Sequence, residues 1–351
     1  MNKLKLIILT FLFLPQINFA QESLNSNSKF YISTKVGYTL PAASTTVGSP
    51  REEVGREFLY IRNNGNDINE FSQQSSTGSR GAGFTTAFSL GYMFNKNIGV
   101  EMEISYLRST TREDARLDVD TSQNQDTRYF AEQYSYTSMF RLAPMLVIQA
   151  DGNSKFQPYA KLGILMPFAG STNIKLSIDD QTGARAMDLL PVINPDSEER
   201  MIEQIGVAVP IPAPTASEIE AKTYGALSIG FASRVGANYQ INDKWKIFGE
   251  LEVNLLSIKA DRTVFTSFES RITSQEFIDA ANAFGLNTSY TIDDIPEIIR
   301  VTQYVDEVTQ NSNSTFDTKS PSYDRDKPLE RKNFRDNYSS WGFFLGIKYA
   351  F

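Results

Sequence analysis

Eight segments of the chain alternate apolar and polar residues with a period of two, which is the pattern of β-strands whose two faces meet different surroundings. The last segment shows this most clearly, because its bulky face takes every second residue and its other face is small or charged. The bulky face consists of Trp341, Phe343, Leu345, Ile347, Tyr349 and Phe351. The eight predicted strands cover residues 30–38, 83–94, 98–106, 130–148, 156–168, 223–239, 245–255 and 341–351.

The connections between these strands alternate sharply in length. Those at 95–97, 149–155 and 240–244 are tight, whereas those at 41–82, 111–128, 170–222 and 261–339 are long and polar. Short turns at one end and long loops at the other are typical of a transmembrane antiparallel barrel with both termini at the periplasmic end. Within the long loops, 197–205 and 274–284 have the apolar spacing of helices, and Ile174, Leu176 and Ile178 are expected to extend a strand above the membrane.

The bulky face of each strand is predicted to point outward, towards lipid. An eight-stranded barrel has an interior that is only just wide enough for side chains to fill, so the small face fits inside and the Phe, Leu, Ile and Tyr face does not. Aromatic residues also gather near strand ends, as they do in the interfacial girdles of membrane barrels. Pro144 and Pro158 each remove a ladder hydrogen bond from a predicted strand, and they are expected to mark β-bulges.

The first twenty residues have the three parts of a secretory signal peptide. Lys3 and Lys5 precede an apolar run at 6–14, Pro15 follows, and cleavage is expected after Ala20. No later stretch is apolar enough for a transmembrane helix, which leaves a soluble, a lipid-anchored or a barrel protein after export. Given the alternating strands, residues 21–351 are predicted to form a single barrel domain with long loops. With no cysteine at the cleavage point, a lipid anchor is excluded.

Composition narrows the chemistry that the chain can perform. It has 351 residues, 34 Lys and Arg against 41 Asp and Glu, a net charge of -7, and neither histidine nor cysteine. Serine–histidine, cysteine–histidine and histidine-ligated zinc chemistries are therefore excluded. The acidic balance argues against a nucleic-acid partner, which normally meets a basic surface. No cofactor is expected.

The carboxyl-terminal segment from Trp341 to Phe351 resembles the closing strand of outer-membrane β-barrels, which ends on Phe with an aromatic residue two positions earlier. Together with the signal peptide and the loop asymmetry, the chain is similar to the OmpA/OmpX-type barrel family, particularly the variants common in Bacteroidota. The resemblance implies residence in the cell outer membrane. It also implies insertion by the barrel-assembly machinery, with Trp341, Phe343, Leu345, Ile347, Tyr349 and Phe351 as the assembly signal. Known catalytic barrels resemble the chain in outline but rely on a histidine that it lacks.

Charged residues are predicted to line the barrel interior at similar depths. They are Lys35, Glu101, Glu103, Arg141, Lys161, Arg234, Glu250, Glu252 and Lys348. One interpretation is a network of ion pairs that fills the lumen, because buried charges must be paired. The other is a gated polar pore lined by the same groups. Eight strands favour the network, and further strands hidden in the long loops would favour the pore.

The paired glutamates do not require a catalytic interpretation. Glu101 and Glu103, like Glu250 and Glu252, share one face of a strand with cations at the same level, so ion pairing explains them better than acid–base chemistry. The Asp pairs at 179–180 and 293–294 lack the spaced oxygen ligands of a calcium loop and are interpreted as solvated turns. No catalytic, cofactor or metal site is predicted.

Basic residues near the outer ends of the third and last strands are candidate contacts for lipopolysaccharide phosphates. They are Arg108, Arg112, Arg116, Arg331, Lys332 and Arg335, with Arg325 and Lys327 nearby. Asp and Glu residues are interleaved in both stretches, so charged external loops without a ligand are the competing explanation.

Three functions are compatible with this pattern. The leading hypothesis is a non-enzymatic outer-membrane barrel that anchors large surface loops for envelope structure or for binding an unidentified ligand or partner. The second is a small-solute, porin-like channel through the polar lumen. The third, an envelope enzyme, is the least supported, since its usual histidine is missing.

Overall fold

The computed structural model describes residues 29–42, 45–46, 57–64, 67–75, 77–120, 128–150, 155–181, 213–283, 285, 287–314 and 320–351. The predicted signal peptide at 1–20 and the predicted helix at 197–205 lie outside these ranges.

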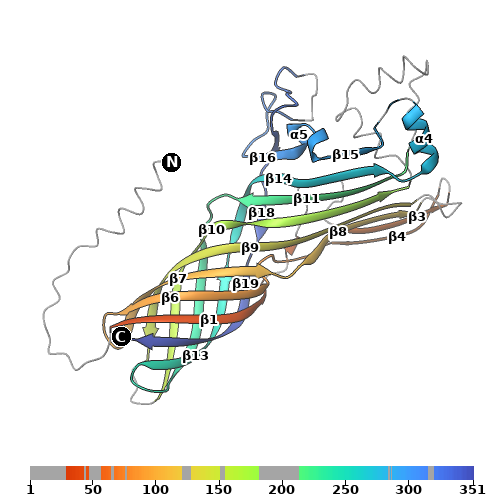
Figure 1. Cartoon of the computed structure of the whole chain (residues 1–351). Helices are drawn as coiled ribbons and strands as arrows, with labels where there is room; N and C mark the ends of the chain where they lie inside the picture. The colour runs from red at the N-terminus through yellow and green to blue at the C-terminus, as the bar shows by residue number, and fades with distance from the viewer. Residues whose placement is uncertain are drawn as a thin grey trace.

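Eight strands form a closed antiparallel barrel (Figure 1). They are β1 (Phe30–Pro41), β6 (Gly83–Met93), β7 (Ile98–Ser109), β9 (Arg128–Gln149), β10 (Phe156–Asp180), β12 (Gly230–Gln240), β13 (Trp245–Leu255) and β19 (Ser340–Ala350). Each pairs with the next, and β19 returns to β1 with Ile347 opposite Thr34. The predicted eight-stranded barrel is confirmed. Its sixth strand begins at Gly230 rather than at residue 223, because the preceding residues belong to a separate strand.

The four long connections contain strands, which the loop prediction missed. The outer halves of β9 and β10 leave the barrel and carry a second sheet, here called the projecting sheet (Figure 1). Its order is β4 (Asp67–Ser75), β3 (Glu57–Asn64), β8 (Arg112–Asp120), β9, β10, β11 (Thr215–Gly225) and β14 (Ser257–Ile272). All of these neighbours are antiparallel except β3 and β8. These extra strands lie outside the barrel wall, so they leave the barrel at eight strands.

Shorter elements complete the projecting sheet. Strands β15 (Ser289–Thr291), β16 (Val301–Val305) and β18 (Arg335–Asn337) pair with successive parts of β14, and β17 (Leu329–Lys332) runs parallel to β16. The helices are α4 (Gln275–Ala283), α5 (Glu297–Arg300) and the 3-10 turn η1 (Ile292–Asp294). Two further short strands, β2 (Thr45–Thr46) and β5 (Thr77–Gly78), pair with each other. The helix predicted at 274–284 and the outward extension of β10 through Ile174, Leu176 and Ile178 are both confirmed.

No helix in the described ranges has the length and hydrophobicity that a bilayer crossing needs.

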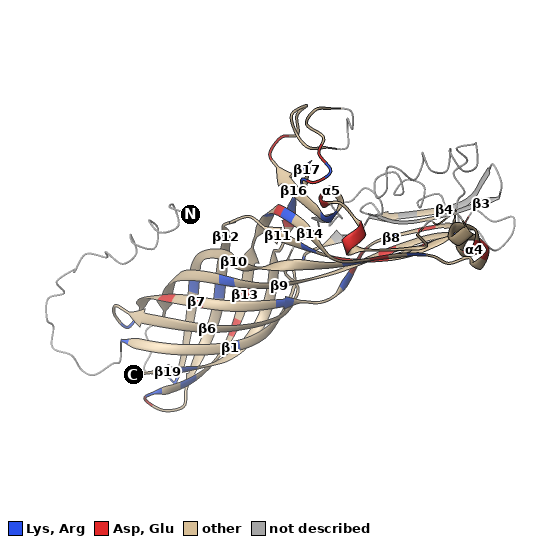
Figure 2. Cartoon of the chain, turned by 45° about the horizontal axis from the view of Figure 1, so that its top comes forward, with Lys and Arg blue, Asp and Glu red and all other residues tan. Residues whose placement is uncertain are grey.

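The outer wall of the barrel is apolar, as the alternation predicts. Outward side chains such as Phe343 and Leu345 are 56% and 59% exposed. Aromatic rings meet across strands at both ends of this wall. Phe30 and Tyr92 have centroids 4.7 Å apart near the chain termini, and Tyr106 and Phe140 are 5.0 Å apart at the opposite rim. Charged residues are sparse along the barrel strands and denser around the projecting sheet (Figure 2).

A β-bulge in β10 allows one strand to serve both regions. The pairing of β10 with β9 shifts by one residue between Pro167 and Ala169. Odd-numbered residues of β10 face inward in the barrel, whereas even-numbered ones face the same side above the bulge. The prediction of bulges at Pro144 and Pro158 is wrong, since the register with the neighbouring strands runs unchanged through both.

The projecting sheet has its own hydrophobic core on the face that continues the barrel interior. Its buried members are Ala115, Tyr129, Ala131, Leu176, Ile219, Ala221, Phe265, Phe268 and Ile295. Side chains from the β15–α5 segment, among them Tyr290, Ile292 and Ile299, pack against this cluster. The sheet is therefore covered on its inner face and open on its outward face.

Candidate functional site

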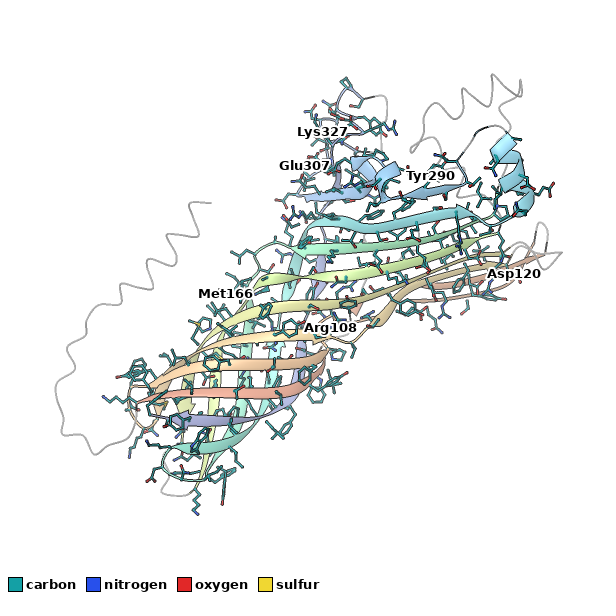
Figure 3. All side chains as sticks on the ribbon, in the orientation of Figure 1. Arg108, Asp120, Met166, Tyr290, Glu307 and Lys327 are labelled. Atoms are coloured by element: carbon teal, nitrogen blue, oxygen red, sulfur yellow. The ribbon has the colours of Figure 1, made fainter. Side chains whose placement is uncertain are left out.

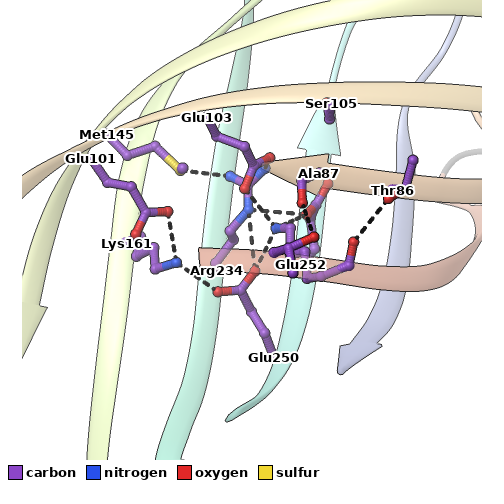
Figure 4. Close-up of polar contacts among 12 residues, drawn as sticks. Thr86, Ala87, Glu101, Glu103, Ser105, Met145, Lys161, Arg234, Glu250 and Glu252 are labelled. Atoms are coloured by element: carbon purple, nitrogen blue, oxygen red, sulfur yellow. Dashed lines mark hydrogen bonds and ion pairs between the residues drawn. The ribbon is translucent and has the colours of Figure 1, made fainter. Parts of the chain in front are cut away.

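Four glutamates and three cations form a continuous ion network across the barrel lumen (Figure 4). The glutamates come in pairs from β7 and β13, because residues two apart on a strand share a face. Lys35 Nζ lies 2.8 Å from Glu103, 2.6 Å from Glu250 and 2.9 Å from Glu252. All of these side chains are at most 2% exposed. One lysine of β1 therefore ties the carboxylates of two separate strands together.

Two further cations close the network. Arg234 of β12 lies 2.8 Å from Glu103, 3.4 Å from Glu250 and 3.0 Å from Glu252. Lys161 of β10 bridges Glu101 at 2.9 Å and Glu250 at 3.0 Å. Every carboxylate thus has at least one cation at contact distance, which is what burial of a charge requires.

Tyrosine hydroxyls supply hydrogen bonds to the same carboxylates. Tyr31 donates to Glu101 at 2.7 Å, and Tyr159 donates to Glu250 at 2.9 Å. Asn254 donates to Glu252. At Glu101 and Glu252 the neutral donor reaches the oxygen that the cations leave open, whereas Tyr159 shares Oε2 of Glu250 with Lys161, so the network is closely hydrogen-bonded.

Arg141 and Lys348 lie in the lumen but contact other groups. Arg141 Nε donates to Ser105 Oγ at 3.1 Å. Lys348 Nζ lies 4.3 Å from the centroid of the Tyr31 ring, 5.3 Å from Tyr159 and 5.9 Å from Phe248. Among the described residues neither has a carboxylate within 4.0 Å. Lys348 is held by aromatic faces instead of by a counter-charge.

Hydrophobic side chains fill the lumen on the side nearer the projecting sheet. The buried cluster there consists of Leu107, Met139, Ala143, Met145, Leu165, Ala232, Leu256, Ile258 and Tyr338. Phe344 points inward from β19 and is fully buried, with Lys35 4.8 Å from its ring centroid. From the end near the chain termini to the projecting sheet, three layers thus fill the lumen. They are the aromatic rings around Lys348, the ion network, and the apolar cluster.

A polar cluster caps these layers at the rim. Arg80 lies 2.9 Å from Asp114 and 3.0 Å from Asp336, and it also donates to Ser135. Although burial acts to lower it, Asp336 and Asp114 raise the pKa of the Arg80 guanidinium above its usual value. The arginine therefore stays charged and holds the segment before β6 against β8, β9 and β18.

Threonine and tyrosine hydroxyls continue the cap across the junction of barrel and projecting sheet. Thr172 lies 2.9 Å from Thr137 and 2.8 Å from the hydroxyl of Tyr338. Burial raises the pKa of Tyr338 to about 12, so its hydroxyl remains protonated and available as a donor. The backbone at Gly81 passes so close to the Tyr338 carbonyl that a Cβ there would lie 2.1 Å from its oxygen.

A small cavity lies on the inner face of the projecting sheet. Its volume is about 20 Å³, and Leu176, Phe265 and Tyr304 are among the residues that line it. That is room for about one water molecule. The buried Gln133 amide also borders it, with a nitrogen that has no hydrogen-bond partner in the described part of the chain. The cavity suits a bridging water better than a ligand. In the residues that the structure describes, no group of three or more His, Cys, Asp or Glu side chains could hold a metal ion.

All nine charged residues predicted for the lumen are buried there, each at most 6% exposed. Alternation alone placed them, because each strand keeps one face inward. The inward aromatic residues were missed as site residues. Tyr31 and Tyr159 lie on the polar face of their strands, and Phe248 and Phe344 interrupt that face with an aromatic ring. An aromatic residue at an inward position of the alternation was therefore the signal that could have identified all four. Arg80 lies in a connection where no alternation could place it.

The candidate lipopolysaccharide contacts do not form one surface. Arg108 and Arg116 lie on outward positions of β7 and β8, whereas Arg112 turns inward to Asp114 at 2.9 Å. Arg331 of β17 borders the inner cavity. Lys332 and Arg335 are exposed near β17 and β18. The structure separates these six residues among three surroundings.

The predicted assembly signal forms the barrel's closing strand. Trp341, Phe343, Leu345 and Ile347 are exposed on the outer wall of β19. Trp245 packs on Tyr349 with ring centroids 4.8 Å apart, and the Phe351 amide donates to the Phe30 carbonyl at 3.1 Å. The terminal residues thus contact both β13 and β1, the two neighbours of the closing strand.

Comparison with known proteins places these features in a family. The family model described as outer membrane protein beta-barrel domain matches residues 7–291. Among solved structures, OprG from Pseudomonas aeruginosa is 14% identical, with 92% of this chain and 96% of that chain covered and a TM-score of 0.33. The outer membrane protein W of E. coli is 13% identical, with 93% and 100% covered and a TM-score of 0.31. Neisserial surface protein A is 9% identical, with 92% and 97% covered and a TM-score of 0.29. No curated protein gives a significant match.

Proposed function

We propose a role that starts from the fact that the chain belongs to the outer membrane protein β-barrel domain family. The barrel is a sealed, non-enzymatic anchor in the cell outer membrane, and the projecting sheet is the part that acts, outside the bilayer, by binding an envelope component or partner. In this proposal residues 1–20 are a cleaved signal peptide. The barrel-assembly machinery reads the closing strand that ends at Phe351.

The filled lumen is the observation that carries this proposal. A pore needs a continuous path of water, but here the ionic layer is capped by Leu107, Met139 and Leu165, each at most 3% exposed. Each of the four glutamates and three cations of the network also has an oppositely charged partner at contact distance, so these seven groups are not available to a passing ion. Both features favour a structural network over a conducting one.

The alternative is a small-solute channel, and the charged lumen is the observation that favours it. Conductance of the refolded full chain in a planar bilayer separates the two. A sealed anchor should produce no single-channel current across the bilayer. Stable single-channel steps that disappear in Arg141→Ala or Glu250→Gln would overturn the anchor and establish the channel.

A second measurement tests membrane integration itself. The folded barrel should resist alkaline extraction of the membrane and migrate differently on SDS gels before and after heating. Deletion of Phe351 should reduce stable assembly, because it removes the contact with Phe30 at the barrel seam. Release of the intact protein by salt or alkaline washing would contradict an integral barrel.

A further inference from the structure

The outward face of the projecting sheet continues the apolar wall of the barrel, because β9 and β10 run through both. Side chains directly opposite one another in neighbouring strands share a face. On this basis Tyr136, Asn173, Lys222 and Val264 stand in one row across β9, β10, β11 and β14. Arg108 opposite Ser138 and Tyr224 opposite Arg262 lie on the same face, next to that row. Figure 3 shows Arg108 where the barrel meets the projecting sheet.

We call this set the boundary band, and define it as Arg108, Tyr136, Ser138, Asn173, Lys222, Tyr224 and Arg262. It has three cations and no carboxylate. The opposite face of the same strands carries four threonines whose hydroxyls bond in two pairs, Thr137 with Thr172 and Thr223 with Thr263. At the level of these four threonines the inner face is therefore uncharged, and the three cations of the band lie on the outward side.

Aromatic rings orient the two arginines of the band. The Arg108 guanidinium carbon lies 3.4 Å from the centroid of the Tyr136 ring, and Nη1 donates to Ser138 Oγ at 2.9 Å. The Arg262 guanidinium lies 5.0 Å from the Tyr224 ring. A stacked guanidinium lies flat against the ring, so its remaining N–H groups can donate to the oxygens of a phosphate group.

The cations of the band differ from those farther out on the same face. Arg116 lies 2.7 Å from Glu113, and Lys175 lies 3.2 Å from Glu218. In the described residues, Arg108, Lys222 and Arg262 have no carboxylate within 4.0 Å. Contact ion pairs thus hold Arg116 and Lys175, whereas the three cations of the band have no such partner.

We infer that the boundary band binds the phosphate groups of a phosphorylated lipid headgroup, that of lipopolysaccharide. Two observations select this occupant. The band directly adjoins the wall that faces acyl chains, at the level where headgroups begin, and its charge is complementary to phosphate. The tyrosine rings beside the arginines offer flat faces for sugar rings. The inference rests on the proposed function, in which the projecting sheet lies on the outer side of the membrane.

The boundary band shares one residue with the phosphate contacts predicted from the sequence. Arg108 belongs to both sets, whereas Arg112 and Arg331 are not in the band because they turn to the inner face. Lys222 and Arg262 belong to the band, although each lies in a segment that the sequence predicts to be a loop. Only strand pairing brings these two cations to the level of Arg108.

The test is equilibrium binding of fluorescent diphosphoryl lipid A to the full chain in zwitterionic detergent micelles. Arg108→Ala with Arg262→Ala should weaken binding roughly 25-fold, at about fivefold for each cation near a charged lipid surface. The matched control is Arg116→Ala with Lys175→Ala, which removes two cations from the same face outside the band. It should leave binding within about twofold of wild type. Arg108→Lys with Arg262→Lys should recover part of the affinity, because charge returns without the planar fork.

Other outcomes would overturn the inference. They are equal losses in the band and control variants, unchanged binding in the band variant, equally tight binding of a dephosphorylated lipid A, or full displacement by millimolar inorganic phosphate. Gel migration before and after heating checks that each variant is folded. The result is independent of conductance: a channel that binds the lipid through the band would overturn only the sealed anchor, and a silent barrel that ignores the lipid would overturn only this inference.

Discussion

The barrel and the projecting sheet share two strands, yet they place polar and apolar residues in opposite ways. In the barrel part of β9, Arg141 points inward and Leu146 points outward. Farther along the same strand, Ala131 lies in a hydrophobic core and Glu132 faces out. Strand β10 repeats the inversion, with Lys161 inside the barrel and Leu176 inside the projecting sheet.

The difference shows that the surrounding medium, and not strand geometry, decides which face is polar. The hydrocarbon around the barrel favours apolar side chains on the outer wall, so the charged side chains lie in the interior, where they must be paired. Water outside the projecting sheet restores the ordinary arrangement, in which burial of apolar area supplies most of the stability. The rim, where Arg80 and Thr172 lie, is the boundary between the two arrangements.

The largest expected effect comes from breaking the charge balance of the barrel. Arg234→Leu places an apolar side chain in the lumen, which keeps the position filled, but it removes the guanidinium that Glu103 and Glu252 share. We expect a loss of about 4 kcal/mol in the free energy of unfolding, because two buried carboxylates each lose one of their two cations and keep only Lys35. Urea titration of the folded protein in lipid vesicles, followed by tryptophan fluorescence, measures this loss.

Arg116→Leu is the matched control for that experiment. It breaks a pair with Glu113 on an exposed side chain, so the loss should stay below about 1 kcal/mol. Equal stability of wild type and Arg234→Leu would mean that the lumen needs only filling, and that the contrast between the two regions is not energetic.

The next effect belongs to the projecting sheet. Leu176→Ala should cost about 3 kcal/mol of local stability, since Leu176 is 2% exposed within the hydrophobic core and the substitution leaves a cavity. Hydrogen exchange should rise in β10, β11 and β14 beyond the rim, while the barrel keeps its heat-modifiable migration. Lys175→Ala, on the outward side of the same strand, serves as control. Loss of barrel migration in Leu176→Ala would show that the two regions unfold as one unit.

The two regions also differ in how far their structure could be predicted from sequence. A lipid-facing wall imposes a strict alternation, which is why all eight barrel strands and the inward charges were predictable. The pairing within the lumen was not, because Lys35 meets Glu250 through the order and register of distant strands. The strands of the projecting sheet were taken for loops because their outward residues meet water and their compositions are polar. The bulge after Pro167 also shifts the phase of β10, so a continuous period of two fails there.

A third prediction concerns that bulge. Gly170 has a φ of +136°, and a Cβ there would lie 2.2 Å from the Ser138 carbonyl oxygen. Gly170→Ala should therefore cost about 2 kcal/mol through backbone strain and displacement of β9. Urea titration in vesicles gives the loss, and Ala169→Ser at the neighbouring exposed position is the control. An unchanged midpoint in Gly170→Ala would show that the shift between the two regions needs no special backbone conformation.

The smallest effect is expected at the rim itself, at the hydroxyl of Thr172. Thr172 contacts Thr137 within the sheet and Tyr338 in the segment before β19. Thr172→Val preserves the shape of the side chain and should cost about 1 kcal/mol, the net value of one hydrogen-bonded hydroxyl. Tyr338→Phe removes the other end of one contact, and a double-mutant cycle isolates the coupling between them. Coupling of about 0.5 kcal/mol or more would mean that the rim transmits stability from the barrel to the projecting sheet. Strict additivity would mean that Thr172 acts through Thr137 alone, so that the two regions meet at the rim without being linked by this hydroxyl.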